Sequence, residues 1–452
     1  MSGFVWICAR RALALATLVL VLSAGFALPA SATKIERITS PGGIEAWLVH
    51  EPSLPLVAME FAFRGGSSQD PADKPGVAHM VTTLLDEGAG DLDSRAFNER
   101  LEEKAIQLKF TAGRDTITGS LRTLVDHRDE AFGLLKLALT APRFDPDAVE
   151  RMRAAILAEL RRQSTRPSDL ADRQWWETAF PGHPYGHAIQ GTVESVEAIT
   201  DAELKAYIDL TFARDTLKIG IVGDIDAETA GRLIDSVFGT LPAHAKLTPV
   251  PDVEPQALGR RVPVKLDVPQ TSLMLGGKGL ARLDPDYMAA YLVNHILGGG
   301  SFTSRLYHEV REKRGLAYSV FSMLFPLKHT AAFFVMTGTR ADRAKETVDV
   351  IESEVRRIAR EGPTADELAK AKSYVKGAYA LAFDTSPKIA TQLVQIQLEN
   401  LGIDYVDRRI AMIDAVTVDD AKRVAQRLLA GGLLVTDAGP TQGAVGKAPA
   451  MQ

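Results

Sequence analysis

The chain has 452 residues, a formal net charge of −5 and 46% hydrophobic residues. This composition is typical of a globular protein with about two to four domains. Because the net charge is mildly negative and no long basic run is present, the composition argues against nucleic acid as a partner.

The first 32 residues are typical of a secretory signal peptide. Arg10 and Arg11 supply positive charge, residues 13–28 supply an apolar core, and Ala30-Ser31-Ala32 is an A-x-A cleavage motif. We expect cleavage near Ala32 and a periplasmic or secreted mature protein, with a membrane anchor as the alternative. The only cysteine, Cys8, lies in this segment, so the mature chain would have neither a disulfide nor thiol chemistry.

Residues 35–245 alternate between strand and helix patterns. Strands are expected at 35–49 (a hairpin around Pro41), 56–64, 108–121 (two strands around Gly113) and 217–223. Helices are expected at 76–90, 94–103, 127–140, 146–163, 168–180, 201–210 and 227–238. The expected N-cap residues are Ser94, Asp145 and Asp226.

The helix expected at 76–90 carries a histidine beside its apolar stripe. Val77, Leu84 and Leu85 recur at helical spacing and predict a buried face. His79 and Thr83 lie one turn apart on a neighbouring face. Two ligands at positions i and i+4 can hold one metal ion, but a threonine hydroxyl is a poor ligand for zinc.

The alternation of strand and helix patterns is interrupted after residue 240 and then resumes. Residues 241–255 contain four prolines and no periodicity, which is typical of a linker. A strand at 271–276 and helices at 286–297 and 366–380 follow. Landmarks such as Ser94-Arg95 and Ser304-Arg305 recur in the same order at a spacing of about 210 residues, which indicates an internal duplication.

We therefore expect an α+β fold with two duplicated domains, each a mostly antiparallel sheet covered by helices. The expected organisation is a signal peptide at 1–32, domains at 33–245 and 260–440, a linker at 246–259 and a disordered tail at 441–452. Two unrelated domains with similar turn signals are the alternative.

Glu159, on the helix expected at 146–163, is a candidate partner for His79. It lies near the apolar face of its helix, where an unpaired carboxylate would be costly. A histidine and a glutamate from separate helices are two of the three ligands that a catalytic zinc needs, beside a general base. Because Thr82 and Thr83 occupy the remaining positions, the simplest interpretation is a buried, hydrogen-bonded His79–Glu159 pair.

Three other motifs have structural interpretations. Gly298–Ser301 is not followed by Gly-Lys-Ser/Thr, so we expect a turn between two helices and no phosphate loop. In His183–His187 (HPYGH), the proline and the glycine exclude the helical spacing that would let the two histidines share a metal ion. Trp175-Trp176 is expected in a core or an interface.

The chain resembles the insulinase/pitrilysin-like zinc metallopeptidases, which include the subunits of the mitochondrial processing peptidase. The resemblance covers about residues 36–435 and is carried by Gly76–His79 (G-x-A-H), Gly65-Gly66, Glu159 and the duplication. Active members carry H-x-x-E-H. Mapped onto this chain, the ligand positions are His79, Thr83 and Glu159, and the base position is Thr82.

The resemblance implies the clam-like, processing-peptidase-like fold, no zinc or other cofactor in this chain, and no peptidase activity of the chain alone. It also implies that Arg311 and Tyr318, within R-x-x-x-G-L-A-Y, contact the substrate backbone near the scissile bond, with Arg314 as the alternative arginine. A guanidinium and a phenol can hold peptide carbonyls and stabilise an oxyanion. The strand at 110–115 would pair with extended substrate.

The expected function is that of the zinc-lacking subunit of an exported heterodimeric peptidase. Its partners would be a homologous zinc-bearing subunit and a peptide or small unfolded protein, with no nucleic acid and no stable membrane insertion. Two alternatives stay open: an autonomous zinc metalloendopeptidase with a degenerate motif, and a non-enzymatic peptide-binding or scaffold protein.

Overall fold

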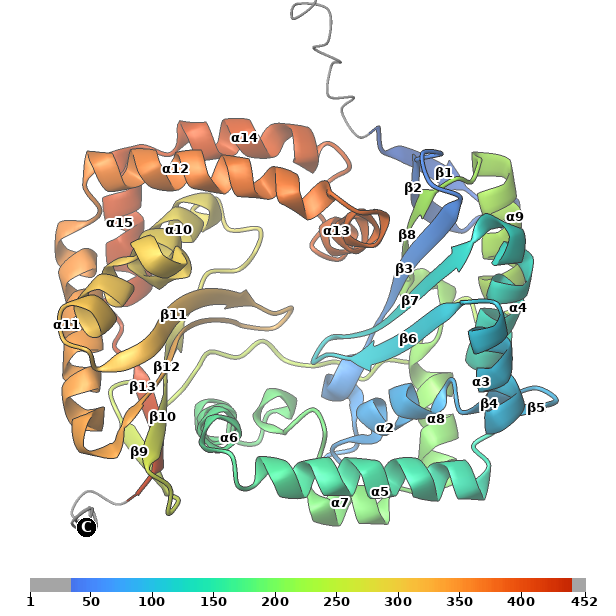
Figure 1. Ribbon diagram of the computed structural model, residues 1–452, viewed down its shortest axis with the longest axis horizontal. Coiled ribbons are helices and arrows are strands. Elements are labelled where there is room, and N and C mark those ends of the chain that lie inside the picture. The colour runs from blue at the N-terminus through green and yellow to red at the C-terminus, as the bar shows by residue number, and fades with distance from the viewer. Residues whose placement is uncertain (1–33, 441–452) are drawn as a thin grey trace, which may run out of the picture. The chain divides into compact units, whose positions relative to one another are not determined.

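The computed structural model describes residues 34–440 (Figure 1). The signal peptide expected at 1–32 and the tail expected at 441–452 lie outside the described residues. Between residues 34 and 440, no helix is both long and apolar enough to cross a membrane.

The first half of the chain builds a six-stranded sheet in the order β1-β2-β8-β3-β7-β6. Its strands are β1 (Glu36–Thr39), β2 (Glu45–His50), β3 (Leu56–Arg64), β6 (Gln107–Ala112), β7 (Thr116–Leu124) and β8 (Lys218–Gly223). The helices of this half are α2 (Val77–Leu84), α3 (Ser94–Glu103), α4 (Arg128–Thr140), α5 (Pro146–Gln163), α6 (Pro167–Ala179), α7 (Val193–Ala198), α8 (Asp201–Thr211) and α9 (Ala227–Phe238).

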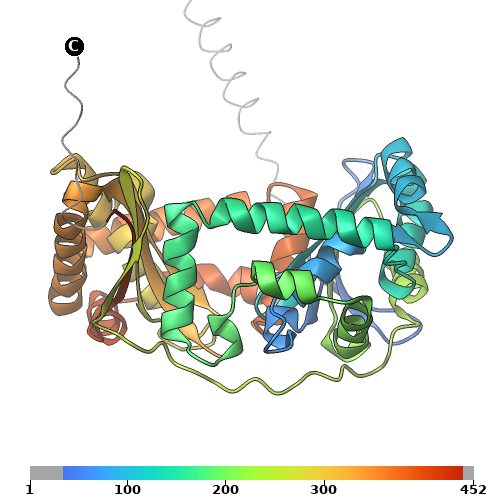
Figure 2. The same cartoon turned by 90° about the horizontal axis from the view of Figure 1, so that it is seen from below.

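The second half builds a five-stranded sheet in the order β11-β12-β10-β13-β9. Its strands are β9 (Arg261–Lys265), β10 (Gln270–Lys278), β11 (Ala317–Pro326), β12 (Ala331–Arg340) and β13 (Leu434–Gly439). Its helices are α10 (Tyr287–Asn294), α11 (Ala344–Glu361), α12 (Ala365–Ala380), α13 (Ser386–Leu398), α14 (Tyr405–Ala415) and α15 (Val418–Leu429). Residues 241–260, in the expected linker region, form neither helix nor strand (Figure 2).

The two sheets have the same topology, which confirms the duplication. In the first sheet β2 runs parallel to β8, and β8, β3, β7 and β6 follow with antiparallel pairing. In the second sheet β9 runs parallel to β13, and β13, β10, β12 and β11 follow with antiparallel pairing. Strands β6 and β11 therefore occupy equivalent edges.

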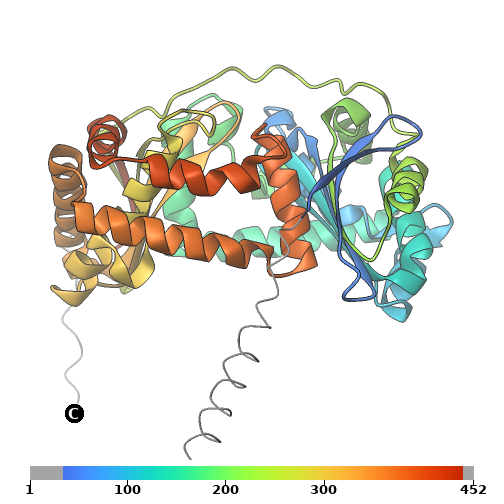
Figure 3. The same ribbon diagram turned by 90° about the horizontal axis from the view of Figure 1, so that it is seen from above.

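Each half contributes one helix to the sheet of the other half. Helix α6 follows α5 and packs on β9, β10 and β13 (Figure 2). Helix α13 follows α12 and packs on β3 and β8 (Figure 3). The expected tryptophan pair on α6 is the core of the first contact: Trp175 is fully buried, and its ring lies 4.6 Å from that of Phe334.

Glycines permit this close approach of helix to sheet. A Cβ on Gly276 of β10 would lie 2.5 Å from the Trp175 ring. A Cβ on Gly220 of β8 would lie 2.8 Å from the backbone oxygen of Ala390 in α13. Helices α6 and α13 thus each pack against a strand at a glycine, where no side chain keeps the helix away.

Most expected elements are confirmed, and three details were wrong. The helix expected at 76–90 ends at Leu84, because Gly88-Ala89 pairs with Leu92-Asp93 as a short ladder (β4 and β5). The N-cap of α3 is Asp93, whose carboxylate accepts from the N–H of Ala96 at 2.8 Å, while Ser94 donates to Glu87. Asp145 flanks α5 as expected, but its side chain pairs with Arg143 and makes no capping hydrogen bond.

Candidate functional site

The start of α2 is fixed by a half-buried carboxylate. Asp70 accepts hydrogen bonds from the N–H groups of Gly76 and Ala78, both at 2.8 Å. Gly76 has a φ of 106°, a left-handed conformation that favours glycine. This arrangement sets the direction of the helix that carries His79.

The two threonines that follow His79 are engaged with their own helix. The Thr82 hydroxyl donates to the carbonyl of His79 at 2.8 Å, and the Thr83 hydroxyl donates to the carbonyl of Met80 at 2.9 Å. Thr82 is only 3% exposed. Neither residue lines the cavity described below. Both hydroxyls therefore satisfy backbone carbonyls, a common arrangement for threonine inside a helix.

Glu159 does not pair with His79, so the expected hydrogen-bonded pair was wrong. Its side chain is 31% exposed and forms ion pairs with Arg162 and Arg166, at 2.9 Å to the Arg162 Nε and 3.1 Å to the Arg166 Nη1. The hydrogen bond from Arg162 lowers the pKa of the Glu159 carboxyl. The third ligand position is thus occupied by a carboxylate that two arginines already neutralise.

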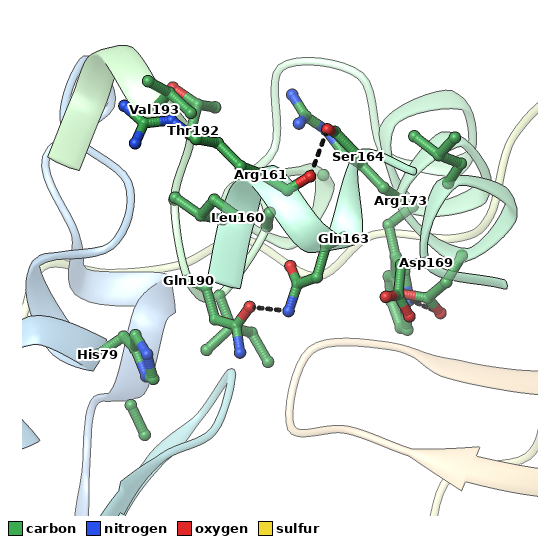
Figure 4. A pocket seen from close by; sticks show the side chains of 18 of the residues that line it. His79, Leu160, Arg161, Gln163, Ser164, Asp169, Arg173, Gln190, Thr192 and Val193 are labelled. Atoms are coloured by element: carbon green, nitrogen blue, oxygen red, sulfur yellow. Dashed lines mark hydrogen bonds between the residues drawn. The ribbon is translucent and has the colours of Figure 1, made fainter. Parts of the chain in front are cut away.

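His79 lines a cavity of about 600 Å³ (Figure 4). The walls come from the end of β6, the end of α5, α6 and the segment 186–194. Burial lowers the pKa of His79, so its imidazole is neutral at physiological pH. Beside it, the side chains of Gln163 and Gln190 are joined by a hydrogen bond (Figure 4).

These residues do not fit a catalytic zinc. One imidazole faces the cavity, the two threonine hydroxyls bond within the helix, and Glu159 is held by arginines. Within residues 34–440, no three His, Cys, Asp or Glu side chains are grouped closely enough to share a metal ion. The positions that correspond to zinc ligands by resemblance thus hold no donor set that suits the metal.

Arg114 also lines this cavity. It is 8% exposed, stacks at 3.8 Å over the Trp176 ring and donates to the carbonyls of Tyr185 and His187. In the same HPYGH segment, His183 accepts from the N–H of Tyr185 and lies 3.0 Å from the carbonyl of Pro251. Both ring nitrogens of His183 are therefore used in holding the loop.

Tyr318 projects from a bulge at the start of edge strand β11. Ala317 pairs with Thr339 and Val320 pairs with Thr337, so β11 holds one extra residue between these pairs. The hydroxyls of Thr339 and Thr337 donate to the carbonyls of Leu316 and Ser319 and fix the bulge. Tyr318 is 81% exposed as a result. Bulges of this kind commonly redirect a side chain at the edge of a sheet.

Arg311 lies beside Tyr318 and comes from a π-helical turn, Tyr307–Glu312. Its guanidinium carbon is 4.4 Å from the centroid of the Tyr318 ring and 5.0 Å from that of Tyr307. Arg314, the alternative arginine, instead donates to the carboxylate and the carbonyl of Glu309 at 2.6 and 2.8 Å. The structure therefore pairs Tyr318 with Arg311 and gives Arg314 a structural partner.

The glycine run before this turn packs against β11. Helix α10 continues as a π-helical turn, His295–Gly299, rather than ending before the glycines. A Cβ on Gly298 would lie 2.5 Å from the hydroxyl of Ser322. Gly298 is thus needed for the contact with β11, which supports the strand that presents Tyr318.

The strand expected to pair with substrate is an edge strand. β6 lies at the end of its sheet and pairs only with β7 among the described strands. Its side chains alternate between buried and exposed, with Phe110 and Ala112 facing the core. The free edge of β6 offers backbone groups that an extended peptide can pair with.

Comparison with known proteins assigns the two halves to related models. Residues 46–193 match the insulinase model (peptidase family M16), and residues 198–375 match the peptidase M16 inactive domain. A solved peptidase M16 inactive domain from Pseudomonas fluorescens is 31% identical with a TM-score of 0.85, and the match covers 90% of this chain and 98% of that one.

Two further relatives carry different descriptions. A non-peptidase homologue from Helicobacter pylori is 28% identical over 335 residues, which is 74% of this chain and 77% of that protein. An uncharacterised zinc protease from Streptomyces coelicolor is 26% identical over 404 residues, which is 87% of each chain. The relatives thus include proteins described as proteases and one described as lacking that activity.

Proposed function

Because the chain belongs to the insulinase family of peptidases, family M16, we propose that it is the zinc-lacking subunit of an exported heterodimeric peptidase. In this role it binds peptide substrate and completes the chamber around the zinc site of a homologous partner. Arg311 and Tyr318 act in trans on the substrate at that site.

The observation that carries the proposal is the Arg311–Tyr318 pair. The guanidinium carbon of Arg311 lies 4.4 Å from the centroid of the exposed Tyr318 ring, while Thr83 and Glu159, at two of the three positions that correspond to zinc ligands, are bonded to other groups of the chain. Such a pair can donate to a peptide carbonyl and stabilise an oxyanion formed from it. The chain thus offers groups that can assist peptide hydrolysis, but it lacks the zinc ligands and the general base that would activate the attacking water.

The test is co-expression with a partner that carries an intact H-x-x-E-H. The pair should cleave a peptide, and Arg311→Ala or Tyr318→Phe should lower kcat by about 10²-fold, as loss of an oxyanion donor does. Arg340→Ala is the matched control, because Arg340 is exposed and its ion pair within residues 34–440 is with Asp342 alone. Unchanged activity in both variants would refute the role in trans.

The two alternatives predict different results for the purified chain. An autonomous metallopeptidase would retain about one zinc per chain and lose cleavage in a chelator. A peptide-binding or scaffold protein would capture a stable partner, and the pair would cleave no peptide. The arginine-bound Glu159 supports neither tight zinc binding nor catalysis by this chain alone.

Export is a separate part of the proposal and rests on Arg10-Arg11, the apolar run and Ala30-Ser31-Ala32. N-terminal sequencing of protein from the native host should begin near Thr33. Recovery of a chain that still begins at Met1 would refute export. The proposed role in a peptidase would then be decided by the activity test alone.

A further inference from the structure

A second cavity, of about 390 Å³, lies in the C-terminal half and shares no lining residue with the cavity at His79. Its walls come from α10, α12, α13 and α14, helices that neighbour one another in Figures 1 and 3. Four of its lining residues are tyrosines and two are arginines: Tyr287, Tyr291, Tyr379, Tyr405, Arg282 and Arg409. The role proposed above uses none of these residues.

Positive charge exceeds negative charge in this cavity. Among the described residues, Glu399 is the only carboxylate that lines it, and it pairs with Arg282 at 2.7 Å. Arg409 is 8% exposed and forms no ion pair within residues 34–440. Its Nη1 donates to the neutral phenol of Tyr405 at 2.7 Å. Arg282 and Arg409 therefore share the charge of Glu399, and one positive charge is left without a counter-anion among the described lining residues, which is costly in a protein interior.

Hydrogen-bond donors are also in excess. Arg409 Nε and the hydroxyl of Tyr379 are buried and have no partner among the described residues. The phenol oxygen of Tyr405 accepts from both Arg282 and Arg409, each at 2.7 Å, so its own hydrogen is directed away from the arginines. Burial raises the pKa of Tyr379 to about 12, which keeps that phenol a donor at neutral pH.

Stacking with tyrosine does not replace an anion. The guanidinium carbon of Arg409 lies 4.3 Å from the centroid of the Tyr379 ring and 5.2 Å from that of Tyr291. Cation–π contacts of this kind involve the face of the guanidinium. The N–H groups at its edge still need acceptors, and Arg409 Nε has none within residues 34–440. An acceptor with negative charge would satisfy both the charge and the donors.

We propose that this cavity is a binding site for a carboxylate, held by Arg409 and the hydroxyls of Tyr379 and Tyr405. A carboxylate matches a guanidinium in shape and accepts several hydrogen bonds at once. It also carries the single negative charge that is missing beside Arg282, Arg409 and Glu399. The ligand is either a small free carboxylic acid or the carboxylate of a peptide.

Calorimetric titration of the full chain in chloride buffer at pH 7 tests the proposal. The probes are acetate, benzoate, an acetylated dipeptide with a free C-terminal carboxylate, the same dipeptide as its amide, and inorganic phosphate. At least one carboxylate should bind with a stoichiometry of one, and the amide should not bind. Binding of the peptide acid alone identifies a chain terminus as the source, whereas binding of acetate or benzoate identifies a free acid.

Two variants and one control locate the binding site. Arg409→Gln should abolish binding, and Tyr379→Phe, which retains the ring, should weaken it by about tenfold or more. Tyr374→Phe is the control, since Tyr374 lies on the same helix, is 61% exposed and does not line the cavity. If Arg409→Gln does not fold, Tyr379→Phe decides alone. The proposal is overturned if no carboxylate binds, if Tyr379→Phe binds as well as the wild type, or if phosphate binds more tightly than every carboxylate.

Discussion

The guanidinium carbon of Arg311 lies 4.4 Å from the centroid of the Tyr318 ring, although one residue belongs to a π-helical turn and the other to a bulged edge strand. The bulge is held by the Thr337 and Thr339 hydroxyls of β12, and Gly298, from the preceding π-helical turn, packs against Ser322 of β11. The pair is therefore positioned by neighbouring structure and contributes little to the core.

Removal of either member of the pair should leave stability almost unchanged. Tyr318 is 81% exposed, so Tyr318→Phe and Arg311→Ala should each change the free energy of unfolding by less than about 1 kcal/mol. Urea denaturation followed by circular dichroism measures this. A decrease of several kcal/mol in the free energy of unfolding of either variant would mean that the residue contributes to packing. A loss of activity in that variant would then reflect impaired folding.

Restoring the two missing residues of the family motif should not restore tight zinc binding. In Thr82→Glu/Thr83→His, Glu159 would still be paired with Arg162 and Arg166. Adding Arg162→Ala and Arg166→Ala should raise zinc affinity by about tenfold or more, because the third ligand is released. Zinc retained after dialysis, measured by elemental analysis, reports the difference.

Arg161→Ala added to the same double variant is the control, since Arg161 lies on α5 and contacts Glu197 rather than Glu159. Equal zinc retention in the variants with and without Arg162 and Arg166 would contradict the assigned role of these arginines.

Glu60 should make stability depend on pH. Burial in the centre of β3 raises the pKa of this carboxyl from 4.5 to about 7. The folded state therefore holds the proton between about pH 4.5 and 7, where the unfolded state has released it. The stability that Glu60 contributes is fully present below that range and is lost as the pH rises to 7 and above.

Glu60→Gln cannot ionise, so its stability should rise relative to the wild type as the pH increases through this range. We expect a gain of about 2 kcal/mol above pH 7, reduced from the full shift to allow for partial solvent exposure. Urea denaturation of both proteins from pH 4 to 8 measures it, and parallel pH profiles would show that Glu60 is not the group responsible.

Gly220→Ala should destabilise the contact between α13 and the first sheet. The added Cβ would lie 2.8 Å from the Ala390 oxygen and 2.9 Å from the Leu393 Cβ, so the helix must shift at a cost of about 1–3 kcal/mol. Gly338→Ala is the matched control, because Gly338 also lies in a strand and a Cβ there meets no atom within 4 Å. Equal thermal unfolding of the two variants would contradict close packing at Gly220.

Local signals predicted most elements because their periodicity is set by neighbours in sequence. The strand at 56–64 and the helix at 94–103 have the predicted bounds. The helix expected at 76–90 was too long, since the ladder between Gly88-Ala89 and Leu92-Asp93 is a pairing that apolar periodicity does not report. The expected α+β fold and its duplication are confirmed by the matching order of the two sheets.

The sequence identified the candidate site residues, but it predicted fewer of the contacts that these residues make. Arg162 follows Glu159 at i+3 on the same helix, so that ion pair was a signal available in the sequence, whereas Arg166 lies past the end of α5. The approach of Tyr318 to Arg311 depends on an extra residue in β11, which only the register with β12 reveals. The cavity proposed to bind a carboxylate combines residues from 282 to 409 on four helices and the segments that flank them, and no short motif marks it.

The reciprocal placement of α6 and α13 makes each half of the chain structurally dependent on the other. A break within residues 241–255 would leave two polypeptides that remain associated, because each carries a helix that covers the partner sheet. Each fragment alone would keep its own helices but lose the helix that the other half packs on its sheet, so it would expose apolar surface such as that around Trp175. Two fragments separated at the linker and expressed together should therefore assemble into one folded protein, whereas either fragment expressed alone should aggregate.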